Sequence, residues 1–337
     1  MPARRPLPRI FRPTETNLAR LASVLRRGGI VGVPSETVYG LAADALSAEA
    51  CAGIFAAKGR PTTDPLIVHL ASPKDLARVA RPNPIALKLA KSLWPGPLTL
   101  VLPKTGEVPD IVTAGKQTVA VRVPAHPLFR KLIKLAGRPL AAPSANPFGY
   151  VSPTTPLHVR DGLAGTALRH VLDGGECEVG VESTIIDLSS PGQPRLLRPG
   201  GLAIEAIEAV AGCKILRPRP ARLRQNVAAP APGMLERHYS PRTPITLHDR
   251  IGEETLRRLP PDEAVLLLRS PSRLDADART FWLSEDGRLE PMARGLFSAL
   301  RELDRGAWKR IHAEVPAGAE GLAPAIRDRL TRAASRR

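Results

Sequence analysis

Along the first 210 residues, segments in which hydrophobic positions repeat at helical spacing alternate with short apolar segments typical of strands. Leu18, Leu21 and Leu25 recur at helical spacing, the pair Gly28-Gly29 ends that pattern, and an apolar run follows. This predicts a helix over residues 16–27 and then a buried strand. Further helices are predicted near 47–57, 73–80, 84–93, 127–136 and 202–210, and further strands near 66–70, 98–102, 118–123, 140–142, 169–172, 183–188 and 195–197. Interleaved strands and helices predict an α/β layer fold with functional groups on loops at strand ends.

The pattern dissolves between residues 214 and 243 and then resumes. That segment is dominated by Arg, Pro and Ala, a composition typical of a stiff linker. After it, strands are predicted at 245–248, 264–268 and 311–315, and helices at 252–258, 292–303 and 322–334. We therefore predict an α/β domain over residues 12–213, a basic Pro-rich linker over 214–243 and a smaller C-terminal α/β domain over 244–335.

Length and composition agree with two folded domains. The chain has 337 residues, enough for two units of about 100–200 residues each. Its three cysteines, Cys51, Cys177 and Cys213, are widely separated, which favours small core residues over disulfides or a C-x-x-C metal site. No apolar run approaches the ~20 residues that span a bilayer, and the Arg-rich start lacks the apolar stretch of a signal peptide. We expect a soluble cytoplasmic protein that does not bind a membrane.

Positive charge is concentrated in three segments. The formal net charge is +17, and residues 1–30, 214–228 and 327–337 carry 15 of those charges. Basic arms attract polyanions, of which nucleic acid is the commonest, although a solvated surface explains them equally well. The chain has only three Trp, three Tyr and six Phe, none of them in the last two segments. This argues against a protein that stacks single-stranded bases on aromatic rings.

Several common catalytic motifs are absent from the sequence. Residues 175–180 have the glycine spacing of a Walker A loop, but Val181 and Glu182 stand where Lys and Ser/Thr must be. The chain has no G-x-G-x-x-G, H-E-x-x-H or G-x-S-x-G, and its seven histidines lack ligand spacing. These absences exclude P-loop, dinucleotide, zinc and serine-hydrolase chemistry.

Short clusters of cations, hydroxyls and amides follow the predicted strands and helices instead. Lys58 and Arg60 end a helix in a Lys-Gly-Arg-Pro turn, and the two cations together suit a polyphosphate. Thr118 and Arg122 share one face of a strand, because side chains there repeat every two residues. The other clusters are residues 34–40, 143–147, 183–184 and 197–200. Taken alone, each cluster is more often a solvated surface or a turn than a ligand site, and His69 is more often a core histidine than a catalytic one. Together they favour a nucleotide site without a covalent nucleophile.

An ordered series of motifs resembles a known family. The motifs are Ser-Glu-Thr-Val-Tyr-Gly-Leu (35–41), Lys-Gly-Arg-Pro (58–61), Pro-Leu-Ile-Val-His (65–69), Trp-Pro-Gly-Pro-Leu-Thr (94–99), Val-Arg-Val-Pro (121–124), Ala-Pro-Ser-Ala-Asn (142–146), Ser-Thr-Ile-Ile-Asp (183–187) and Leu-Arg-Pro-Gly (197–200). They resemble the YrdC-like domain of the L-threonylcarbamoyladenylate synthases. Residues 232–241 and 321–330 are similar to the long, two-domain form of that family. The resemblance implies a YrdC-like twisted mixed sheet with helices, followed by a smaller Rossmann-like α/β domain.

The resemblance also implies a reaction. L-threonine, bicarbonate or CO2, and ATP would give L-threonylcarbamoyl-AMP and pyrophosphate, the nucleotidyl transfer that begins N6-threonylcarbamoyladenosine modification of tRNA. The threonine amine captures CO2 and the carbamate attacks the α-phosphorus, so positioning and charge neutralisation carry most of the step. Mg²⁺ would bridge the ATP phosphates, held mainly by ATP and water. The implied partners are a downstream threonylcarbamoyl-transfer complex and tRNA itself.

Matching motif positions places two substrate sites on this sequence. The implied threonine site is Thr37, His69, Arg122, the backbone of Ala142, and Ser183. The implied ATP site is Lys58, Arg60, Asp64, Thr118, Ser144, Asn146, Ser152, Arg198 and Tyr239. Arg122 would pair with the amino-acid carboxylate, Lys58 and Arg60 would act as catalytic cations on the triphosphate, and Tyr239 would bring the linker over the ligand as a lid.

Two positions depart from the family pattern. Ser35 stands where the family generally has Thr, which is a conservative exchange of hydroxyls. Asp64 stands where Asn is common, and an anion would repel the ATP phosphates. The ATP contact of Asp64 therefore rests on its position alone.

Two other functions stay open at this point. A non-enzymatic RNA-binding YrdC-like module would bind tRNA with a steep salt dependence and would ignore threonine. The carbamoyltransferase role of YrdC-like domains in hydrogenase maturation ranks third, because its zinc-finger and acylphosphatase regions are absent here. The synthase hypothesis requires Lys58, Arg122, Ser144 and Arg198 to face one ligand pair in the folded chain.

Overall fold

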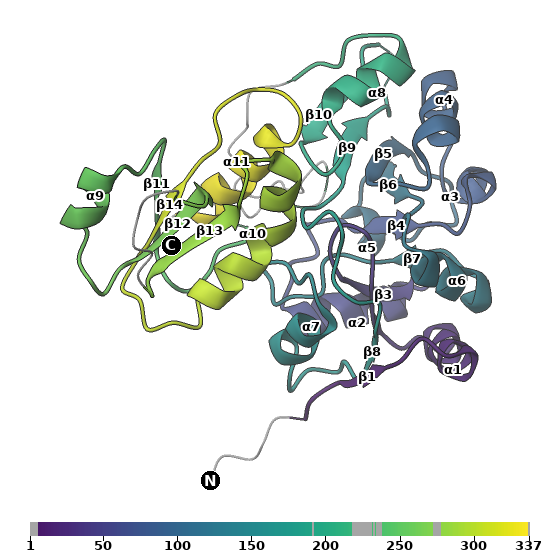
Figure 1. Ribbon diagram of the computed structural model, residues 1–337. Coiled ribbons are helices and arrows are strands. Elements are labelled where there is room, and N and C mark those ends of the chain that lie inside the picture. Colours follow the sequence, from purple (N-terminus) through teal and green to yellow (C-terminus); the bar gives the residue numbers. More distant parts are fainter. Residues whose placement is uncertain are drawn as a thin grey trace.

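The computed structural model describes residues 6–190, 192–217, 231, 233, 238–271 and 278–335. Within those residues the chain forms a ten-stranded and a four-stranded sheet (Figure 1). The first sheet contains β1 (Arg9–Phe11), β2 (Val31–Val33), β3 (Gly40–Asp44), β4 (Ile67–His69), β5 (Leu98–Pro103), β6 (Thr118–Arg122), β7 (Leu140–Ala141), β8 (His170–Leu172), β9 (Thr184–Asp187) and β10 (Arg195–Arg198). Its helices are α1 (Glu15–Arg26), α2 (Ala48–Lys58), α3 (Leu76–Val79, after a 3-10 turn at Pro73–Asp75), α4 (Pro84–Leu93), α5 (Asp110–Thr113), α6 (Pro127–Ala136), α7 (Pro156–Gly162) and α8 (Ile204–Ala211).

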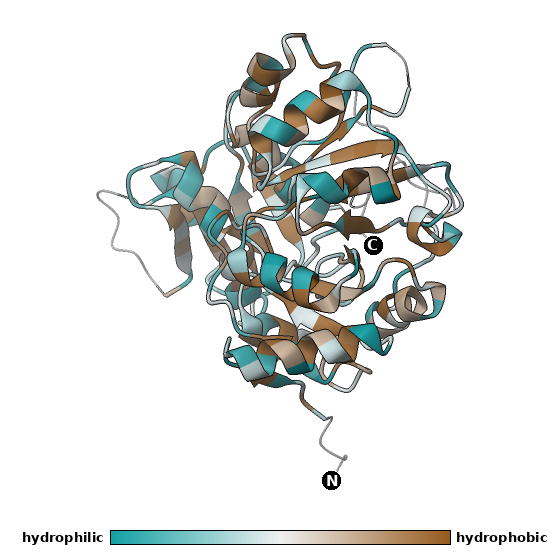
Figure 2. Ribbon diagram, turned by 90° about the vertical axis from the view of Figure 1, so that its right-hand side faces the viewer, coloured by the Kyte–Doolittle hydropathy of each residue, from teal (hydrophilic) through white to brown (hydrophobic). Residues whose placement is uncertain are grey.

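The first sheet is mixed and has helices on both faces. Its strand order is β1-β8-β2-β3-β7-β4-β6-β5-β9-β10, with parallel pairs such as β4–β6 beside antiparallel pairs such as β5–β6. Leu21 of α1 and Phe129 of α6 pack on one face, and Ile54 of α2 and Leu89 of α4 pack on the other. The helices carry alternating hydrophilic and hydrophobic bands, whereas the strands are mainly hydrophobic (Figure 2). Such bands are typical of helices that bury one stripe against a sheet.

The sheet face that carries α1 and α6 continues into a stretch that packs against Ala231 of the linker. Ile67 of β4, Ala120 of β6 and Ile185 of β9 form one apolar cluster with Ala231 of the linker. Because side chains on one face repeat every two residues, Arg122 is the next position of β6 on this face. The Arg122 end of β6 therefore lies on the same sheet face that Ala231 contacts.

The second sheet is parallel throughout and lies in the C-terminal part of the chain. Its order is β11-β14-β12-β13, formed by β11 (Ile245–His248), β12 (Ala264–Arg269), β13 (Thr280–Ser284) and β14 (Ile311–Glu314). Helices α10 (Leu289–Leu303) and α11 (Ala323–Ala333) pack on one face, and α9 (Glu253–Arg258) packs on the other. Helices on both faces are typical of parallel sheets. The predicted fold class, a mixed α/β unit followed by a smaller Rossmann-like unit, is confirmed.

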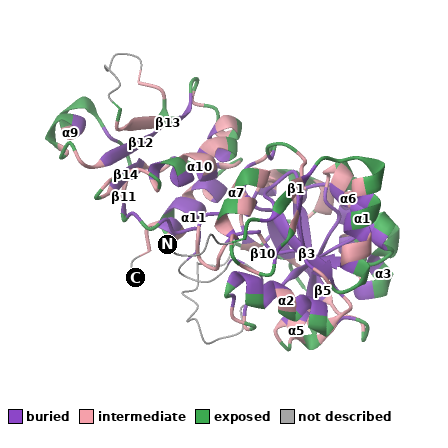
Figure 3. Cartoon of the chain, turned by 90° about the horizontal axis from the view of Figure 1, so that it is seen from below, coloured by how far each residue is buried: buried purple, intermediate pink, exposed green. Residues whose placement is uncertain are grey.

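Helices α10 and α11 lie between the second sheet and the larger unit (Figures 1 and 3). Val151 and Val181 of the larger unit belong to the same apolar cluster as Leu296 of α10. The Tyr150 hydroxyl donates a hydrogen bond of 2.7 Å to Asp304, just after that helix. The two units therefore share an interface that contains both apolar and polar contacts.

Gly180 allows α10 to approach the larger unit closely. Its φ is +78°, and a Cβ there would lie 2.4 Å from both the Ala293 carbonyl oxygen and the Arg294 Cα. Because α10 would have to shift, we expect Gly180→Ala to lower the free energy of unfolding by about 1–3 kcal/mol or more, measured by denaturant unfolding. Gly175 has a similar φ of +75° with nothing within 4 Å of its added Cβ. Gly175→Ala should therefore destabilise less, and equal losses would contradict a role for close approach.

Every helix and strand predicted from periodicity is present, most of them within two residues of the predicted bounds. The prediction missed β1, β3, α5, α7 and β13. Strand β3 has the sequence Gly-Leu-Ala-Ala-Asp and is buried on both faces, so it shows no alternation and no β-branched residue. Of the predicted linker, residues 218–230, 232 and 234–237 lie outside the described residues, and the domain bounds stay predictions. In the part of the chain that the structure describes, no helix has the length and apolar character to cross a membrane.

Candidate active site

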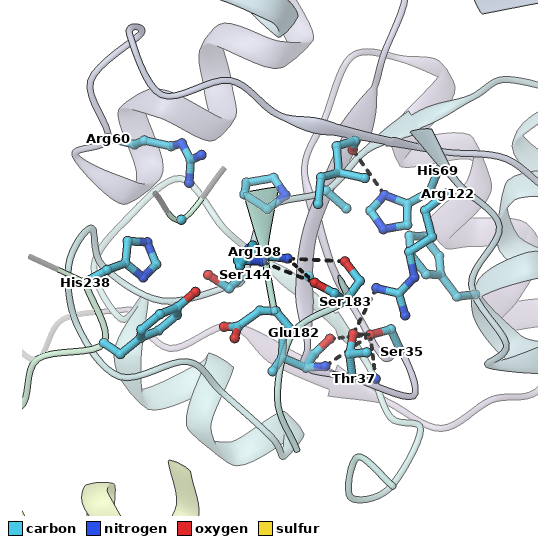
Figure 4. A pocket seen from close by; sticks show the side chains of 18 residues that line it. Ser35, Thr37, Arg60, His69, Arg122, Ser144, Glu182, Ser183, Arg198 and His238 are labelled. Atoms are coloured by element: carbon cyan, nitrogen blue, oxygen red, sulfur yellow. Dashed lines mark hydrogen bonds between the residues drawn. The ribbon is translucent and has the colours of Figure 1, made fainter. Parts of the chain in front are cut away.

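One pocket collects polar side chains from seven stretches of the chain (Figure 4). It is lined by Ser35, Thr37, Val38, Gly40, Arg60, Ile67, His69, Arg122, Phe129, Ala142, Pro143, Ser144, Glu182, Ser183, Arg198, Gly233, His238 and Tyr239. Its three arginines are buried, so they are not the solvated surface cations that each cluster taken alone would suggest. Buried charges act on one another and on a ligand through a low dielectric, so their pairing decides what the pocket can hold.

Arg122 is held in place at one end of the pocket. Its Nε donates to the Gly96 carbonyl at 3.1 Å and its Nη1 to the Thr37 hydroxyl at 3.0 Å, while Nη2 lies 2.7 Å from Glu36 Oε1. Burial alone would raise the pKa of Glu36, but Arg122 lowers it below its usual value. Glu36 is therefore ionised, and the pair holds a planar guanidinium at the end of β6.

Ser183 and Arg198 meet near the middle of the pocket. Arg198 Nη2 donates to the Ser183 carbonyl at 2.9 Å and to its hydroxyl at 3.2 Å. The same hydroxyl lies 2.7 Å from the Thr99 hydroxyl. Arg198 ends β10 and Ser183 precedes β9, so the antiparallel pairing of these strands brings the two residues together.

Arg60 lies at the other end of the pocket, after α2. Gly59 ends that helix in a left-handed conformation, which turns the chain toward the pocket. Arg60 donates to the carbonyls of Asp64, at 3.1 Å, and Pro65, at 2.7 Å, and Nη2 lies 3.0 Å from the Asp64 carboxylate. Asp64 is fully buried, and Arg60 compensates its negative charge. The carboxylate therefore does not face a ligand without a counter-charge.

Lys58 lies beside the pocket but does not line it. Its Nζ donates to the backbone carbonyls of Ser144 and Asn146, each at 2.5 Å. Burial and the neighbouring Arg60 lower the pKa of Lys58 well below its usual value. Lys58 thus supports the loop that presents the Ser144 hydroxyl. Its expected contact with a triphosphate stays a prediction.

Linker residues His238 and Tyr239 cover the Arg60 end of the pocket. Tyr239 has a φ of +63°, rare for a residue with a side chain, and its ring packs against His238 and Phe297 at centroid distances of 4.1 and 5.4 Å. Its buried hydroxyl has no partner among the described residues. Burial raises the pKa of Tyr239 to about 12, so the hydroxyl stays protonated and can donate to a ligand.

Two family profiles match this chain almost end to end. One, described as "Telomere recombination" and covering Sua5, YciO and YrdC proteins, matches residues 23–200, and one described as "Threonylcarbamoyl-AMP synthase, C-terminal domain" matches residues 202–335. The threonylcarbamoyl-AMP synthase of Pyrococcus abyssi is 44% identical over 329 residues, which are 94% of this chain and 93% of that protein. The chain belongs to the threonylcarbamoyl-AMP synthase family. The synthase of Bacillus subtilis is 39% identical over 332 residues, covering 96% of this chain and 94% of that protein.

Solved structures of the synthase family agree with this assignment. The crystal structure of Pyrococcus abyssi Sua5 complexed with L-threonine has a TM-score of 0.87 and 42% identity, covering 97% of both chains. As a member of the synthase family, the chain is an enzyme with a nucleotidyltransferase-type activity. The predicted family, its two-domain form and the class of enzyme are confirmed. The alternative of a non-enzymatic RNA-binding module is therefore not supported.

The structure gathers most of the predicted site residues around the pocket. Nine line it: Thr37, Arg60, His69, Arg122, Ala142, Ser144, Ser183, Arg198 and Tyr239. Five lie outside the lining: Lys58, Asp64, Thr118, Asn146 and Ser152. Asn146 donates to the carbonyls of Pro147 and Tyr150, and Thr118 lies at the far end of β6, opposite Pro103. Of the four residues that the synthase hypothesis requires to face one ligand pair, Arg122, Ser144 and Arg198 line the same pocket. Lys58 lies beside it and contacts the Ser144 carbonyl.

The acidic side of the pocket was not predicted from the sequence. Glu182 entered it only as a residue that rules out a Walker A loop, yet it lines the pocket and accepts a hydrogen bond of 2.6 Å from Ser152. Arg329 of α11 donates to the same carboxylate at 2.8 Å. A signal existed, because Arg329 follows Ile326 by three residues and precedes Leu330, on the apolar face of a predicted helix.

His69 gives the fold a measurable dependence on pH. Burial and the neighbouring Arg122 lower the pKa of His69 to about 3, against 6.5 when unperturbed. As the pH falls through about 6.5, His69 becomes protonated in the unfolded chain but stays neutral in the folded chain. The free energy of unfolding therefore has its full value above that pH and decreases below it. Between about pH 7.5 and about pH 5, this group should account for ~2 kcal/mol of lost unfolding free energy. Urea unfolding of wild type and His69→Gln measures it; equal losses in both would mean that His69 titrates normally.

Proposed function

We propose that this chain makes L-threonylcarbamoyl-AMP and pyrophosphate from L-threonine, bicarbonate or CO2, and ATP. The threonine amine takes up CO2 and loses a proton, which gives a carbamate. A carbamate oxygen then bonds to the α-phosphorus of ATP while the bond to the bridging oxygen of the β-phosphate breaks, and pyrophosphate leaves. The supporting observation is a single pocket with Arg122 at one end and Arg198 and Arg60 toward the other.

The Arg122 end suits the amino acid. The guanidinium is already oriented by Thr37 and Glu36, and its planar fork matches a carboxylate. The backbone carbonyl of Ala142 and the hydroxyl of Ser183 are acceptors that would orient the amine. No covalent nucleophile is needed, since the threonine nitrogen attacks CO2 and the carbamate attacks phosphorus.

The Arg60 end suits the polyphosphate. Arg60 and Arg198 would balance the charge that develops on the leaving pyrophosphate, and the Ser144 hydroxyl would donate to a phosphate oxygen. Lys58 would act through the Ser144 loop. Thr118 shares the face of Arg122 along β6, which favours an adenosine that extends out of the pocket along that strand.

Mg²⁺ is proposed as part of the substrate complex with ATP. Three carboxylates in or beside the pocket, those of Glu36, Asp64 and Glu182, are each ion-paired to an arginine. Among the described residues no group of three or more His, Cys, Asp or Glu side chains is placed to hold a metal ion. Phosphate oxygens and water would therefore supply the ligands, which is usual for this ion.

His238 and Tyr239 are proposed to keep water from the intermediates. A carbamate and a mixed anhydride both hydrolyse, so a covered pocket protects them. The protonated Tyr239 hydroxyl would also donate to a phosphate. Substrate entry would then require His238 and Tyr239 to move away from the pocket, and their return over the ligands would gate the reaction.

The product is proposed to leave for a threonylcarbamoyl-transfer complex in the cytoplasm, which acylates the N6 amine of a tRNA adenosine. Direct binding of tRNA is a second candidate, supported by the basic segments 1–30, 214–228 and 327–337. Titration of tRNA at several salt concentrations tests it. A strong fall in affinity with salt supports contact with the phosphate backbone.

Pyrophosphate release tests the proposed reaction directly. The purified chain with MgATP, threonine and bicarbonate should release pyrophosphate, and mass spectrometry should detect threonylcarbamoyl-AMP. Leaving out any one substrate should stop release. Turnover without threonine, or pyrophosphate without the mixed anhydride, would contradict the proposal.

A further inference from the structure

The C-terminal domain places one fully buried guanidinium at the border of the pocket. Arg329 of α11 has no exposed surface, and its Nε donates to Glu182 at 2.8 Å. Its Nη1 donates to the Pro199 carbonyl at 2.7 Å and to Asp328 at 2.9 Å. The guanidinium carbon lies 5.2 Å from the centre of the Tyr239 ring. A buried charge destabilises a fold unless it is paired, so this set of contacts fixes the arginine.

Glu182 is the carboxylate that Arg329 compensates. Its side chain lines the pocket between Ser183 and the linker, with Ser152 donating to one oxygen and Arg329 to the other. Burial alone would raise the pKa of Glu182, but Arg329 and Arg198 lower it below its usual value. Glu182 therefore carries a full negative charge in a pocket that must accept a polyanion.

Arg329 also contacts two neighbours of residues proposed to bind substrate, and one such residue directly. Glu182 directly precedes Ser183, and Pro199 directly follows Arg198. The third contact is the ring of Tyr239 itself. One side chain of the C-terminal domain thus holds the start of β9, the end of β10 and the linker in a single arrangement.

We propose that Arg329 is a positioning residue of the nucleotide site, which neutralises Glu182 and orders Tyr239 so that the pocket accepts a triphosphate. The proposal rests on the proposed function for the identity of that ligand. It assigns the C-terminal domain a task in ATP binding. The larger unit and the linker supply the pocket, and Arg329 of the smaller unit supplies the positive charge that compensates Glu182.

A role confined to joining the two units makes different predictions. Arg294 of α10 also links them, through a hydrogen bond of 2.8 Å from its Nε to the Glu178 carbonyl, but it does not line the pocket. Arg294→Ala is therefore the matched control, because it removes a contact between the units without changing charge next to the ligand.

Isothermal titration with MgATP on the full chain tests the proposal. Arg329→Met keeps the apolar stem and removes the charge, and it should weaken MgATP binding by roughly tenfold or more, because a carboxylate is left facing the phosphates. Adding Glu182→Gln to that variant should restore much of the affinity. Arg294→Ala should bind MgATP like wild type, and the KM for threonine should change far less than the affinity for MgATP.

The double substitution separates positioning from simple stability. Circular dichroism establishes that each variant is folded; if Arg329→Met is not, Arg329→Lys, which keeps the charge but loses the fork, should bind MgATP with intermediate affinity. Wild-type affinity in the folded single variant, or no recovery on adding Glu182→Gln, overturns the proposal while leaving the synthase reaction intact. A wild-type chain that binds no MgATP overturns both.

Discussion

Arg122→Ala is expected to lower kcat/KM for threonine by roughly 100-fold or more, because a charged hydrogen bond contributes about 1.5–3 kcal/mol and a carboxylate held by the fork loses two of them. The substitution also removes the partner of the buried Glu36. Loss of one member of a buried pair destabilises a fold by about 3–5 kcal/mol, so the variant should unfold at lower denaturant concentration. Pyrophosphate release against threonine concentration, with urea unfolding in parallel, measures both effects.

Arg122→Lys is the control for this prediction. It keeps the charge beside Glu36 but cannot offer the planar fork, so its stability should recover more than its activity. The KM for ATP should stay close to that of wild type, since Arg122 lies at the far end of the pocket from Arg60. Wild-type kinetics for threonine in the alanine variant would remove Arg122 from the substrate site.

Lys58→Ala is expected to lower kcat/KM for ATP by roughly 10–150-fold, the loss of charged hydrogen bonds of about 1.5–3 kcal/mol. The structure supplies a reason beyond charge, because Nζ holds the carbonyls of Ser144 and Asn146. Without it, two backbone carbonyls lose their donor and the Ser144 hydroxyl loses its fixed position. Steady-state kinetics at varied ATP concentration measures the loss.

Two further variants sharpen the test of Lys58. Arg60→Ala removes a pocket cation without touching the Ser144 loop and should give a loss of similar size. Lys91→Ala changes an exposed lysine of α4 and should leave kinetics unchanged. If Lys58→Ala behaved like Lys91→Ala, the loop contact would not matter for ATP.

Periodicity predicted nearly all of the fold because most elements bury one stripe or one face. The helix from residue 127 to 136 is an example, since its apolar positions repeat at helical spacing and Phe129, Leu132 and Ile133 are buried. Strand β3 escaped because both of its faces are buried and its residues are mainly Gly and Ala. Short helices such as α5 offer too few residues for a period to show.

The sequence predicted the cations and hydroxyls of the site but not the ion pairs between its arginines and carboxylates. Motif positions led to Arg122 and Arg198, whereas nothing local shows which carboxylate neutralises which arginine. The Glu36–Arg122 pair joins the loop after β2 to the end of β6, and Glu182 and Arg329 are separated by 147 residues. Such long-range contacts follow from how the strands are ordered in the sheet, which a single sequence does not reveal.

The distance between Glu182 and Arg329 along the chain has a consequence for synthesis in the cell. A ribosome completes every strand of the larger sheet before it begins α11. Until that last helix emerges, the nascent chain carries the carboxylate without its counter-charge. A premature stop codon ahead of Ala323 would leave the first unit intact in sequence yet impaired in nucleotide affinity.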